Sequence, residues 1–481
     1  MQLALIGILD DGWAGLSEAA RTALKKSDLI LGVGRTLELI RPHLSSSETL
    51  IKSDPFGLSL SKPLLLQEMP FDRLRTNEIN QCFPSNASCV ELRDMDGALG
   101  KTPGWAREAI QAGRKVAVLA TGDPLCHGLA TYLLGKIGPV EVSILPAPST
   151  LQIASARWQK PWQDAVIASC HGADAGEWFA GATPEHGLYP LMRAIAQNPC
   201  VLAFTSPQNT PSRLARALLT AGYGVETQLY VASRLLQEDE RIDRALTLEE
   251  AAGMRFPEPN VVRLERQETA WEKMPRLALE DAEYQQRTPE KGLITKQEAR
   301  ALSLAKLRLG PAAVVWDIGA GSGSVGLEAA RLAPQGHVWA IEKNAEDCAN
   351  ARANVRKFRV SNYTLHHGKA PSGLEDWPDP DAVFIGGSGG ELAGLIEMIL
   401  WRLRPQGRLV MNFVTLENLA TATGTLKAQG AGWEVVQLQA SRSQPILDMH
   451  RMAAQNPVWV VTAWRIDHDN HKRAQKTGEA A

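Results

Sequence analysis

Val314-Val-Trp-Asp-Ile-Gly-Ala-Gly-Ser-Gly-Ser-Val-Gly-Leu-Glu-Ala-Ala-Arg-Leu332 is the stretch around which the C-terminal half of the chain is organised. Its first three residues are apolar, as in a buried parallel strand, and its last eight have helical spacing and good helix formers. Between them, Gly319, Gly321 and Gly323 predict a tight turn. A strand, a glycine turn and a helix N-terminus leave backbone N–H groups pointing into a cleft, with no Cβ to keep a ligand away.

The end of the next apolar run indicates the ligand. The run His337 to Ile341 ends in Glu342, and a carboxylate at a strand end can accept hydrogen bonds from both hydroxyls of a ribose. Asp317, two residues before the first glycine, is placed to hold the ammonium group of a methionine, which a dinucleotide lacks. We therefore expect S-adenosylmethionine (SAM). The G-x-G-x-x-G spacing from Gly321 leaves a dinucleotide, or a turn without a ligand, as alternatives.

The last part of the chain supports this expectation. Arg408 to Val414 has the pattern of a strand, and Leu416 to Gln429 that of a helix. Trp433 to Ala440 and Pro457 to Ile466 follow as two strands, which suggests a terminal antiparallel hairpin. The sheets of SAM-dependent methyltransferases end in this way. The sequence therefore predicts a Rossmann-like α/β domain with a seven-stranded sheet over residues 291–468.

Length and composition restrict the class of protein. A chain of 481 residues predicts two or three domains. Its 51 Lys and Arg nearly balance its 53 Asp and Glu, so a global basic field for nucleic acid is excluded. The six cysteines are scattered without a C-x-x-C pair, which argues against a metal site or disulfide framework and fits a reducing compartment. Without a signal peptide or membrane-length apolar run, we expect a cytoplasmic protein that does not bind membranes.

The N-terminal half begins with the pattern of a βαβ unit. Gln2 to Ile8 and Asp28 to Val33 predict strands, and Leu16 to Lys26 predicts a helix with one buried stripe. Such a unit is right-handed, and we expect it to bury the two strands as a parallel pair. Two later strands, Val116 to Ala120 and Val142 to Leu145, open onto Gly- and Pro-containing turns. Turns at such strand ends are where open α/β sheets bind ligands.

Three stretches without periodic apolar residues interrupt this pattern. Residues 53–88 predict a weakly ordered insertion, because a loop of this length is unusual inside a compact domain. The polar residues 267–290 predict a linker between two domains, and residues 469–481 a disordered tail.

Several phrases of the N-terminal half match a known family. Besides the opening strand with its Asp-Gly, they are Gly32-Val-Gly-Arg35, Ala120-Thr-Gly-Asp-Pro124, Leu145-Pro-Ala-Pro-Ser149, His171-Gly172 and Asn260-Val-Val-Arg-Leu-Glu265. On these phrases, the N-terminal half resembles the tetrapyrrole (precorrin) methylases. The resemblance implies a two-lobed α/β domain over residues 1–266.

Further phrases of the C-terminal half match a second family. They are Leu293-Ile-Thr-Lys-Gln-Glu-Ala-Arg300, Trp316-Asp-Ile-Gly-Ala-Gly-Ser-Gly323 and Phe384-Ile-Gly-Gly-Ser-Gly-Gly-Glu-Leu392. They resemble the decarboxylating precorrin methyltransferases. The order of both halves in one chain resembles the fused precorrin-6Y C5,15-methyltransferases (decarboxylating) of cobalamin synthesis.

The resemblance implies a function. The chain is expected to use SAM at two sites to methylate a reduced, anionic precorrin of the precorrin-6B type at C5 and C15. It is also expected to remove the ring C acetate carboxyl as CO2, giving precorrin-8. By analogy, the N-terminal domain would methylate C5, and the C-terminal domain would methylate C15 and decarboxylate. Relatives of the C-terminal domain suggest a homo-oligomer. The alternative is a SAM-dependent methyltransferase acting on another substrate, with a degenerate N-terminal scaffold.

The candidate cofactor contacts come from the residue patterns and from the resemblance. Thr295 is implied by the resemblance, whereas its position before a helix, three residues ahead of Glu298, equally predicts an N-cap with a capping box. Ala370 would offer its backbone to the adenine, next to Lys369, which stands where relatives often carry Asp. The predicted SAM contacts are Thr295, Asp317, Gly319, Ala320, Gly321, Ser322, Gly323, Glu342 and Ala370 in the C-terminal domain, and Gly122, Asp123 and Pro124 in the N-terminal domain.

The anionic substrate predicts arginines at the open edge of the C-terminal sheet. Arg300, Arg442 and Arg451 are candidates because they fall in expected turn regions, and guanidinium groups bind carboxylates bidentately. The alternative for each is a solvated surface charge. No catalytic side chain is assigned, since methyl transfer to carbon needs mainly proximity, orientation and exclusion of water.

We predict that Gly321→Val abolishes SAM binding at the C-terminal site, because a branched side chain would occupy the path of the cofactor. Calorimetric titration of the variant with SAM measures this loss. Wild-type affinity in the variant would refute the placement of the site.

Overall fold

The computed structural model describes residues 2–44, 51–52, 90–126, 129–267, 277–287 and 294–466. The predicted insertion and tail lie outside these residues. The chain forms two compact units, Met1–Trp162 with Ala232–Ile242, and Gln163–Val231 with Asp243–Ala481. Within the described residues, no helix is both long and apolar enough to span a bilayer.

The first unit is built on a six-stranded sheet in the order β3-β4-β2-β5-β1-β6. Its strands are β1 (Leu3–Ile8), β2 (Leu29–Gly32), β3 (Ile51–Lys52), β4 (Glu91–Asp94), β5 (Val116–Thr121) and β6 (Val142–Leu145). Its helices are α1 (Glu18–Lys25), α2 (Gly34–Ile40), α3 (Thr102–Gln111), α4 (Leu129–Ile137) and α5 (Thr150–Trp158), with 3₁₀ turns η1 (Gly12–Gly15) and η2 (Arg41–His43).

The predicted pairing of the first two strands is wrong. β1 and β2 are parallel to the same neighbour, but β5 lies between them: Val118 faces Leu5 on one side and Leu31 on the other. All but the last residue of β5 is buried, so the centre of the sheet is the favourable place for this apolar strand.

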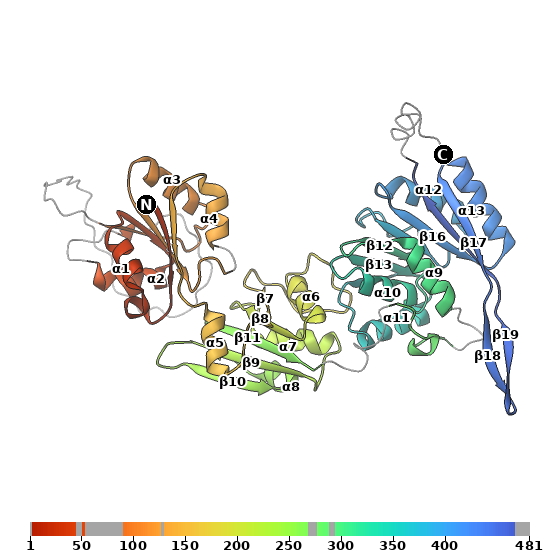
Figure 1. Ribbon diagram of the computed structural model, residues 1–481, viewed down its shortest axis with the longest axis horizontal. Coiled ribbons are helices and arrows are strands. Elements are labelled where there is room, and N and C mark those ends of the chain that lie inside the picture. The colour runs from red at the N-terminus through yellow and green to blue at the C-terminus, as the bar shows by residue number, and fades with distance from the viewer. Residues whose placement is uncertain are drawn as a thin grey trace, which may run out of the picture. The chain divides into compact units, whose positions relative to one another are not determined.

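Alternate residues of the strands face opposite helix layers. Ala4 and Ile6 of β1 belong to a hydrophobic cluster with residues of α1 and α2. Leu3 and Leu5 belong to another cluster, with residues of α3 and α4. Figure 1 shows the two helix pairs on opposite sides of the sheet. The pleat of the strand produces this alternation, and both faces are thereby covered.

A five-stranded sheet in the order β10-β9-β11-β8-β7 belongs to the second unit, apart from the end of β9 and the start of β10. Its strands are β7 (Val166–Ser169), β8 (Cys200–Phe204), β9 (Thr227–Ser233), β10 (Arg241–Leu246) and β11 (Asn260–Arg266). One core cluster joins this sheet to residues of its three helices, α6 (Tyr189–Gln197), α7 (Pro211–Thr220) and α8 (Leu248–Gly253).

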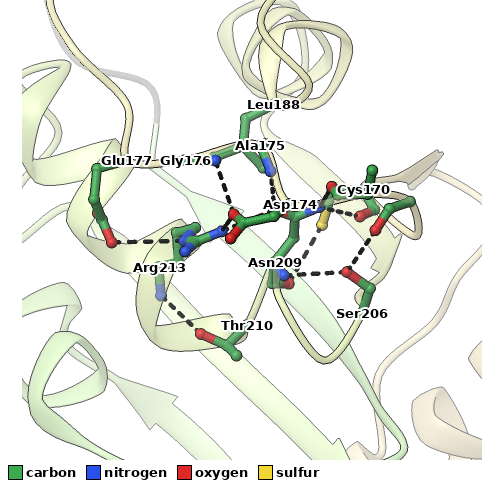
Figure 2. Close-up of polar contacts among 12 residues, drawn as sticks. Cys170, Asp174, Ala175, Gly176, Glu177, Leu188, Ser206, Asn209, Thr210 and Arg213 are labelled. Atoms are coloured by element: carbon green, nitrogen blue, oxygen red, sulfur yellow. Dashed lines mark hydrogen bonds and ion pairs between the residues drawn. The ribbon is translucent and has the colours of Figure 1, made fainter. Parts of the chain in front are cut away.

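A buried asparagine fixes the loops that leave this sheet after β7 and β8 (Figure 2). The side-chain amide of Asn209 donates to the carbonyl of Cys170 at 2.9 Å and accepts from the amide of Ala175 at 3.1 Å. Arg213, one helical turn further on, pairs with Asp174. These contacts fix the loop that carries the His171-Gly172 phrase against the start of α7.

The C-terminal part of this unit confirms the predicted seven-stranded sheet, in the order β14-β13-β12-β15-β16-β20-β17. Its strands are β12 (Val314–Ile318), β13 (His337–Glu342), β14 (Tyr363–His367), β15 (Ala382–Ile385), β16 (Arg408–Phe413), β17 (Gly432–Leu438) and β20 (Val458–Trp464). β20 runs antiparallel to both neighbours, which confirms the terminal hairpin. The sequence did not predict the two-stranded ribbon of β18 (Ser441–Ile446) and β19 (Met449–Ala454) between the last two strands.

Helices cover both faces of this sheet. They are α9 (Gln297–Leu307), α10 (Ser324–Leu332), α11 (Ala345–Lys357), α12 (Leu392–Arg402) and α13 (Leu416–Ala428). Trp316 of β12 packs in one cluster with residues of α12 and α13, whereas Val315 packs in another with residues of α9 and α10. Figure 1 shows these helices on the two sides of the sheet.

The predicted linker includes a packed segment. Residues 277–287, with the 3₁₀ turn η3 (Asp281–Glu283), lie against the C-terminal domain. Leu279 and Tyr284 are buried in the same cluster as Val315. The described part of the linker therefore contributes to the core of the C-terminal domain.

Candidate functional site

The glycine turn after β12 is hydrogen-bonded to the end of β13. The amides of Gly319 and Ala320 donate to the carbonyl of Ile341 at 2.9 and 3.1 Å, and the amide of Gly321 donates to Oε2 of Glu342 at 2.9 Å. The expectation that these N–H groups point into a cleft is therefore wrong. They fix the turn against the neighbouring strand instead.

Glu342 is held at the wall of the site by backbone donors. Its Oε1 accepts from the amide of Asn344 at 2.8 Å, while Oε2 accepts from Gly321. The residue is buried but borders the cavity described below. Each carboxylate oxygen has two lone pairs, so both retain capacity for a further donor such as a ribose hydroxyl.

The turn also lies against the loop after β15 with almost no space between them. A Cβ on Gly319 would lie 2.6 Å from the carbonyl oxygen of Gly387 and 2.7 Å from its nitrogen. Gly319 has a backbone φ of +71, a conformation that residues with a side chain rarely adopt. By contrast, a Cβ on Gly321 would have nothing within 4 Å. One glycine allows the two loops to meet, and the other leaves open space.

A cavity of about 350 Å³ lies between these loops and the end of β13. This volume is at the lower end of that of small-molecule sites, about 300–1,000 Å³. Its walls combine the glycine turn, the loop after β15, the start of α11 and the segment before α9: Gln286, Arg287, Ile294, Ile318, Gly319, Gly321, Ser322, Ile341, Glu342, Lys343, Asp347, Gly368, Lys369, Ala370, Gly386, Gly387, Ser388 and Gly389.

One residue of the wall, Ser322, has a side-chain hydroxyl without a hydrogen-bond partner in the described part of the chain. Oγ of Ser322 is buried and has no hydrogen-bond partner among the described residues, and Ser322 lines the cavity. Buried hydroxyls normally have partners. Together with Glu342, this hydroxyl fits a ligand that carries a ribose and other polar groups.

Of the predicted SAM contacts in the C-terminal domain, the structure brings five to the cavity: Gly319, Gly321, Ser322, Glu342 and Ala370. Gly323 instead serves as the N-cap of α10, with φ +79. The cavity wall includes Ile294 rather than its neighbour Thr295. The predicted capping box is wrong, because Lys296 is the N-cap of α9 and makes no side-chain cap.

Asp317 lies beneath the glycine turn and does not line the cavity. Its Oδ2 accepts from the amide of Gly326 at 3.1 Å, and Oδ1 has no partner among the described residues. Burial raises the pKa of Asp317 to about 7, and the nearby Glu342 adds to the rise. The contact with a methionine ammonium stays a prediction, whereas the bond to α10 is present.

The three candidate arginines do not lie in turns. Arg300 is in α9, 0% exposed, and pairs with the equally buried Glu328 at 2.7 Å, so it is not available to a substrate. Arg442 is in β18 and pairs with Glu298 at 2.6 Å. Arg451, in β19, is exposed. Their predicted positions at the edge of the sheet are wrong, since a helix and the unpredicted ribbon hold them.

The sequence interpretation missed two charged pairs at the cavity. Arg287 binds Asp347 through two hydrogen bonds of 2.8 and 2.7 Å. Lys369 pairs with Glu391 at 3.0 Å, half-exposed. No local pattern marked Arg287, because it lies in a polar stretch. The Gly-Gly-Ser-Gly-Gly phrase after β15, by contrast, was visible in the sequence.

The predicted N-terminal contacts lie where three strand ends meet. A Cβ on Gly7 of β1 would lie 2.1 Å from the carbonyl oxygen of Gly122 and 2.4 Å from the nitrogen of Ala147. Gly122 itself has φ +72 and donates to the carbonyl of Ile8 at 2.9 Å. Asp123, before Pro124, accepts from the amide of Leu125 at 2.9 Å, so its side chain stabilises the turn. Binding through the backbone of this turn stays a prediction.

Comparisons with known proteins place the chain in a family. The model of the Tetrapyrrole (Corrin/Porphyrin) Methylases matches residues 2–252, and that of the Precorrin methyltransferase domain matches residues 288–467. A Sinorhizobium protein named precorrin-6Y C(5,15)-methyltransferase (decarboxylating) is 30% identical over 464 residues, which cover 96% of this chain and 95% of the relative. The chain belongs to the precorrin-6Y C5,15-methyltransferase family.

Membership of this family makes the chain a methyltransferase that uses SAM, in agreement with the interpretation of the glycine turn. A Salmonella typhimurium protein named cobalt-precorrin-6B C(15)-methyltransferase (decarboxylating) is 40% identical over 181 residues, 37% of this chain and 92% of the relative. A crystal structure titled precorrin-6y C5,15-methyltransferase, from Geobacter metallireducens, is 42% identical, with a TM-score of 0.38, and the match covers 40% of this chain and 98% of that one.

The buried Asp317 predicts a pH-dependent stability. Its folded pKa of about 7 exceeds its ordinary value of 3.8. Between about pH 4 and about pH 7, the unfolded chain therefore releases a proton that the folded chain retains, and stability falls as pH rises. Asp317→Asn retains an acceptor for Gly326 and removes this penalty.

Thermal unfolding of the ligand-free protein measures the effect. The Tm of Asp317→Asn relative to wild type should increase from about pH 5 to about pH 8. A difference in Tm that is constant over this range would contradict the raised pKa.

Proposed function

We propose that this chain methylates a precorrin at C5 and C15, with SAM as the methyl donor, and removes the ring C acetate carboxyl as CO2. The observation that carries the proposal is the match over 96% of the chain to a relative named for these reactions. The cavity beside Glu342 supports it, because its walls have the features expected for one of the two cofactors.

The residues of the C-terminal cavity would each hold a part of SAM. When bound, SAM supplies a methyl group that is activated by a positively charged sulfur. The carboxylate of Glu342 would accept hydrogen bonds from the ribose, and Oγ of Ser322 would gain a partner. The space beside Gly321 admits a ligand, and the closely packed backbones of Gly319 and Gly387 keep water from that side.

We assign C15 methylation and decarboxylation to the C-terminal domain, and C5 methylation to the N-terminal domain. Support for the division comes from the Salmonella relative, which is named for the C15 and decarboxylating reactions and matches 37% of this chain. A second SAM site would lie at the carboxyl edge of the first sheet, where Gly7 and Gly122 bring strand ends together.

The substrate would be an anionic precorrin, of the precorrin-6B type. Two exposed lysines line the C-terminal cavity. Lys343 would offer its charge to acetate and propionate groups, and Lys369 would do so by exchanging its partner Glu391. Exclusion of nucleic acid and a cytoplasmic location stay predictions.

Mass spectrometry of the product tests the function. The full-length protein, with the reduced ring substrate and SAM, should add two methyl groups and release one CO2. Gly321→Val should still add one methyl group but should not decarboxylate. Gly122→Val should lose the other methyl group, since φ +72 and the Ser149 backbone at 3.2 Å leave no room for a side chain.

Three results would contradict parts of the proposal. An unchanged ring mass with wild-type protein would refute the activity, and methylation of RNA would favour another substrate. If Gly122→Val still adds both methyl groups, the N-terminal domain is a scaffold.

We also propose that the protein is a homo-oligomer in which the β18–β19 ribbon binds a second copy of the chain. The tip of the ribbon is apolar and exposed: Leu447 is 93% exposed and Met449 is 61% exposed. The two strands pair with each other and with no other strand among the described residues. A two-stranded ribbon is marginally stable alone, so contact with another ribbon would stabilise both.

Leu447→Asp should shift the protein toward monomer, because a carboxylate at an apolar contact would be desolvated. Sedimentation velocity measures the shift. The matched control is Leu416→Asp at the start of α13, where the leucine is 64% exposed and the oligomer should be retained. Wild-type protein that is already monomeric, or equal effects of both changes, would contradict the role of the ribbon.

A further inference from the structure

The segment 277–287, which we name the strap, makes three sets of contacts around the C-terminal cavity. It belongs to the predicted linker, and it lies just before residue 288, where the match to the Precorrin methyltransferase domain begins. Leu279 and Tyr284 anchor it in the core. The strap is therefore packed like part of a domain although it lies outside the region that defines the domain.

The first set of contacts joins the strap to α10, the helix that follows the glycine turn. The carboxylate of Glu328 accepts from the amides of Ala278 and Leu279 at 2.6 and 3.1 Å. It also accepts from the hydroxyl of Tyr284 at 2.8 Å and from Nε of Arg300 at 2.7 Å. Glu328 is fully buried, so these donors are what stabilise its charge.

The second set joins the strap to the glycine turn through one side chain. Asn354 of α11 is fully buried. Its Oδ1 accepts from the amide of Gln285 at 2.8 Å, and its Nδ2 donates to the carbonyl of Gln285 at 2.9 Å. The same Nδ2 donates to the carbonyl of Ser322 at 2.9 Å. A single amide thus fixes the strap and the cavity wall in one arrangement.

The third set lies at the cavity itself. Arg287 and Asp347 both line it, and their two parallel hydrogen bonds set the position of the first turn of α11. That turn follows Asn344, whose amide donates to Glu342. The end of the strap is therefore connected to the carboxylate that would hold the ribose.

We infer that the strap is a working part of the C-terminal cofactor site, and that Arg287 is a positioning residue on which the affinity for SAM depends. The inference rests on the proposed function. It means that two walls of the cavity, the glycine turn and the start of α11, are fixed by residues from between the two family regions. A methyltransferase domain that begins at residue 288 would lack these contacts.

Titration of the full-length protein with S-adenosylhomocysteine tests the inference. This probe carries no net charge at neutral pH, so removing a guanidinium does not by itself attract or repel it. Gly321→Val identifies which binding event belongs to the C-terminal cavity. Arg287→Met should raise the Kd of that event about tenfold, equivalent to about 1.4 kcal/mol, and leave any N-terminal event unchanged.

Two further variants separate positioning from a general loss of stability. Arg287→Asp combined with Asp347→Arg should recover most of the affinity, because the pair is restored with its charges exchanged. Arg404→Met, which breaks the exposed pair with Asp381, should change Tm as little as Arg287→Met does and should leave the Kd unchanged. Tyr284→Phe, which removes only the hydroxyl from Glu328, is a second probe of the strap and should also raise the Kd.

The outcomes are distinguishable. If wild-type protein binds the probe at the C-terminal cavity and both Arg287→Met and Tyr284→Phe bind it equally well, the inference is wrong and the proposed function stands. If wild-type protein shows no binding that Gly321→Val removes, the C-terminal cofactor site of the proposed function fails, and the inference fails with it.

Discussion

The C-terminal site depends on a contact between two backbones. Gly319 and Gly387, at the ends of neighbouring parallel strands, lie so close that a single added carbon would be 2.6 Å from a carbonyl oxygen. This approach places the glycine turn, the loop after β15 and Glu342 around one cavity. The N-terminal sheet uses the same device, since Gly7 lies against the backbones of Gly122 and Ala147. In each sheet, a glycine without a Cβ allows two loops at the carboxyl ends of the strands to come into contact.

Hydrogen bonds to neighbouring elements also hold the glycine turn in place. Its first amides donate to the end of β13, and Asp317 ties the strand before it to α10 through Gly326. The strap is bound to this framework through Asn354 of α11 and Glu328 of α10. A ligand that enters the cavity would meet groups that are already positioned, which reduces the entropy lost on binding. The cost is a buried, partly unsatisfied Asp317, whose raised pKa is the sign of that constraint.

The sequence predicted the features that depend on local pattern. The seven-stranded sheet, its terminal hairpin and the placement of Gly321, Ser322 and Glu342 at one cavity followed from strand periodicity and from a glycine turn at a strand end. Prediction from the sequence failed for features that depend on packing between residues far apart in the chain. The sequence does not distinguish Arg300 from a surface arginine, because the partners that allow its burial include Glu328, 28 residues away, and Asp281. The strap has no periodic apolar residues because only a few side chains, such as Leu279 and Tyr284, anchor it in the core. The order of strands in a sheet, with β5 between β1 and β2, is likewise not encoded in a local pattern.

The crystal structure of the full-length protein with S-adenosylhomocysteine is the most direct test of this account. We expect ligand density in the C-terminal cavity, with the ribose hydroxyls within hydrogen-bond distance of the Glu342 carboxylate and the ligand in the open space beside Gly321. A saturated crystal with no density in that cavity, or with the ligand bound where it does not touch Glu342, would contradict it.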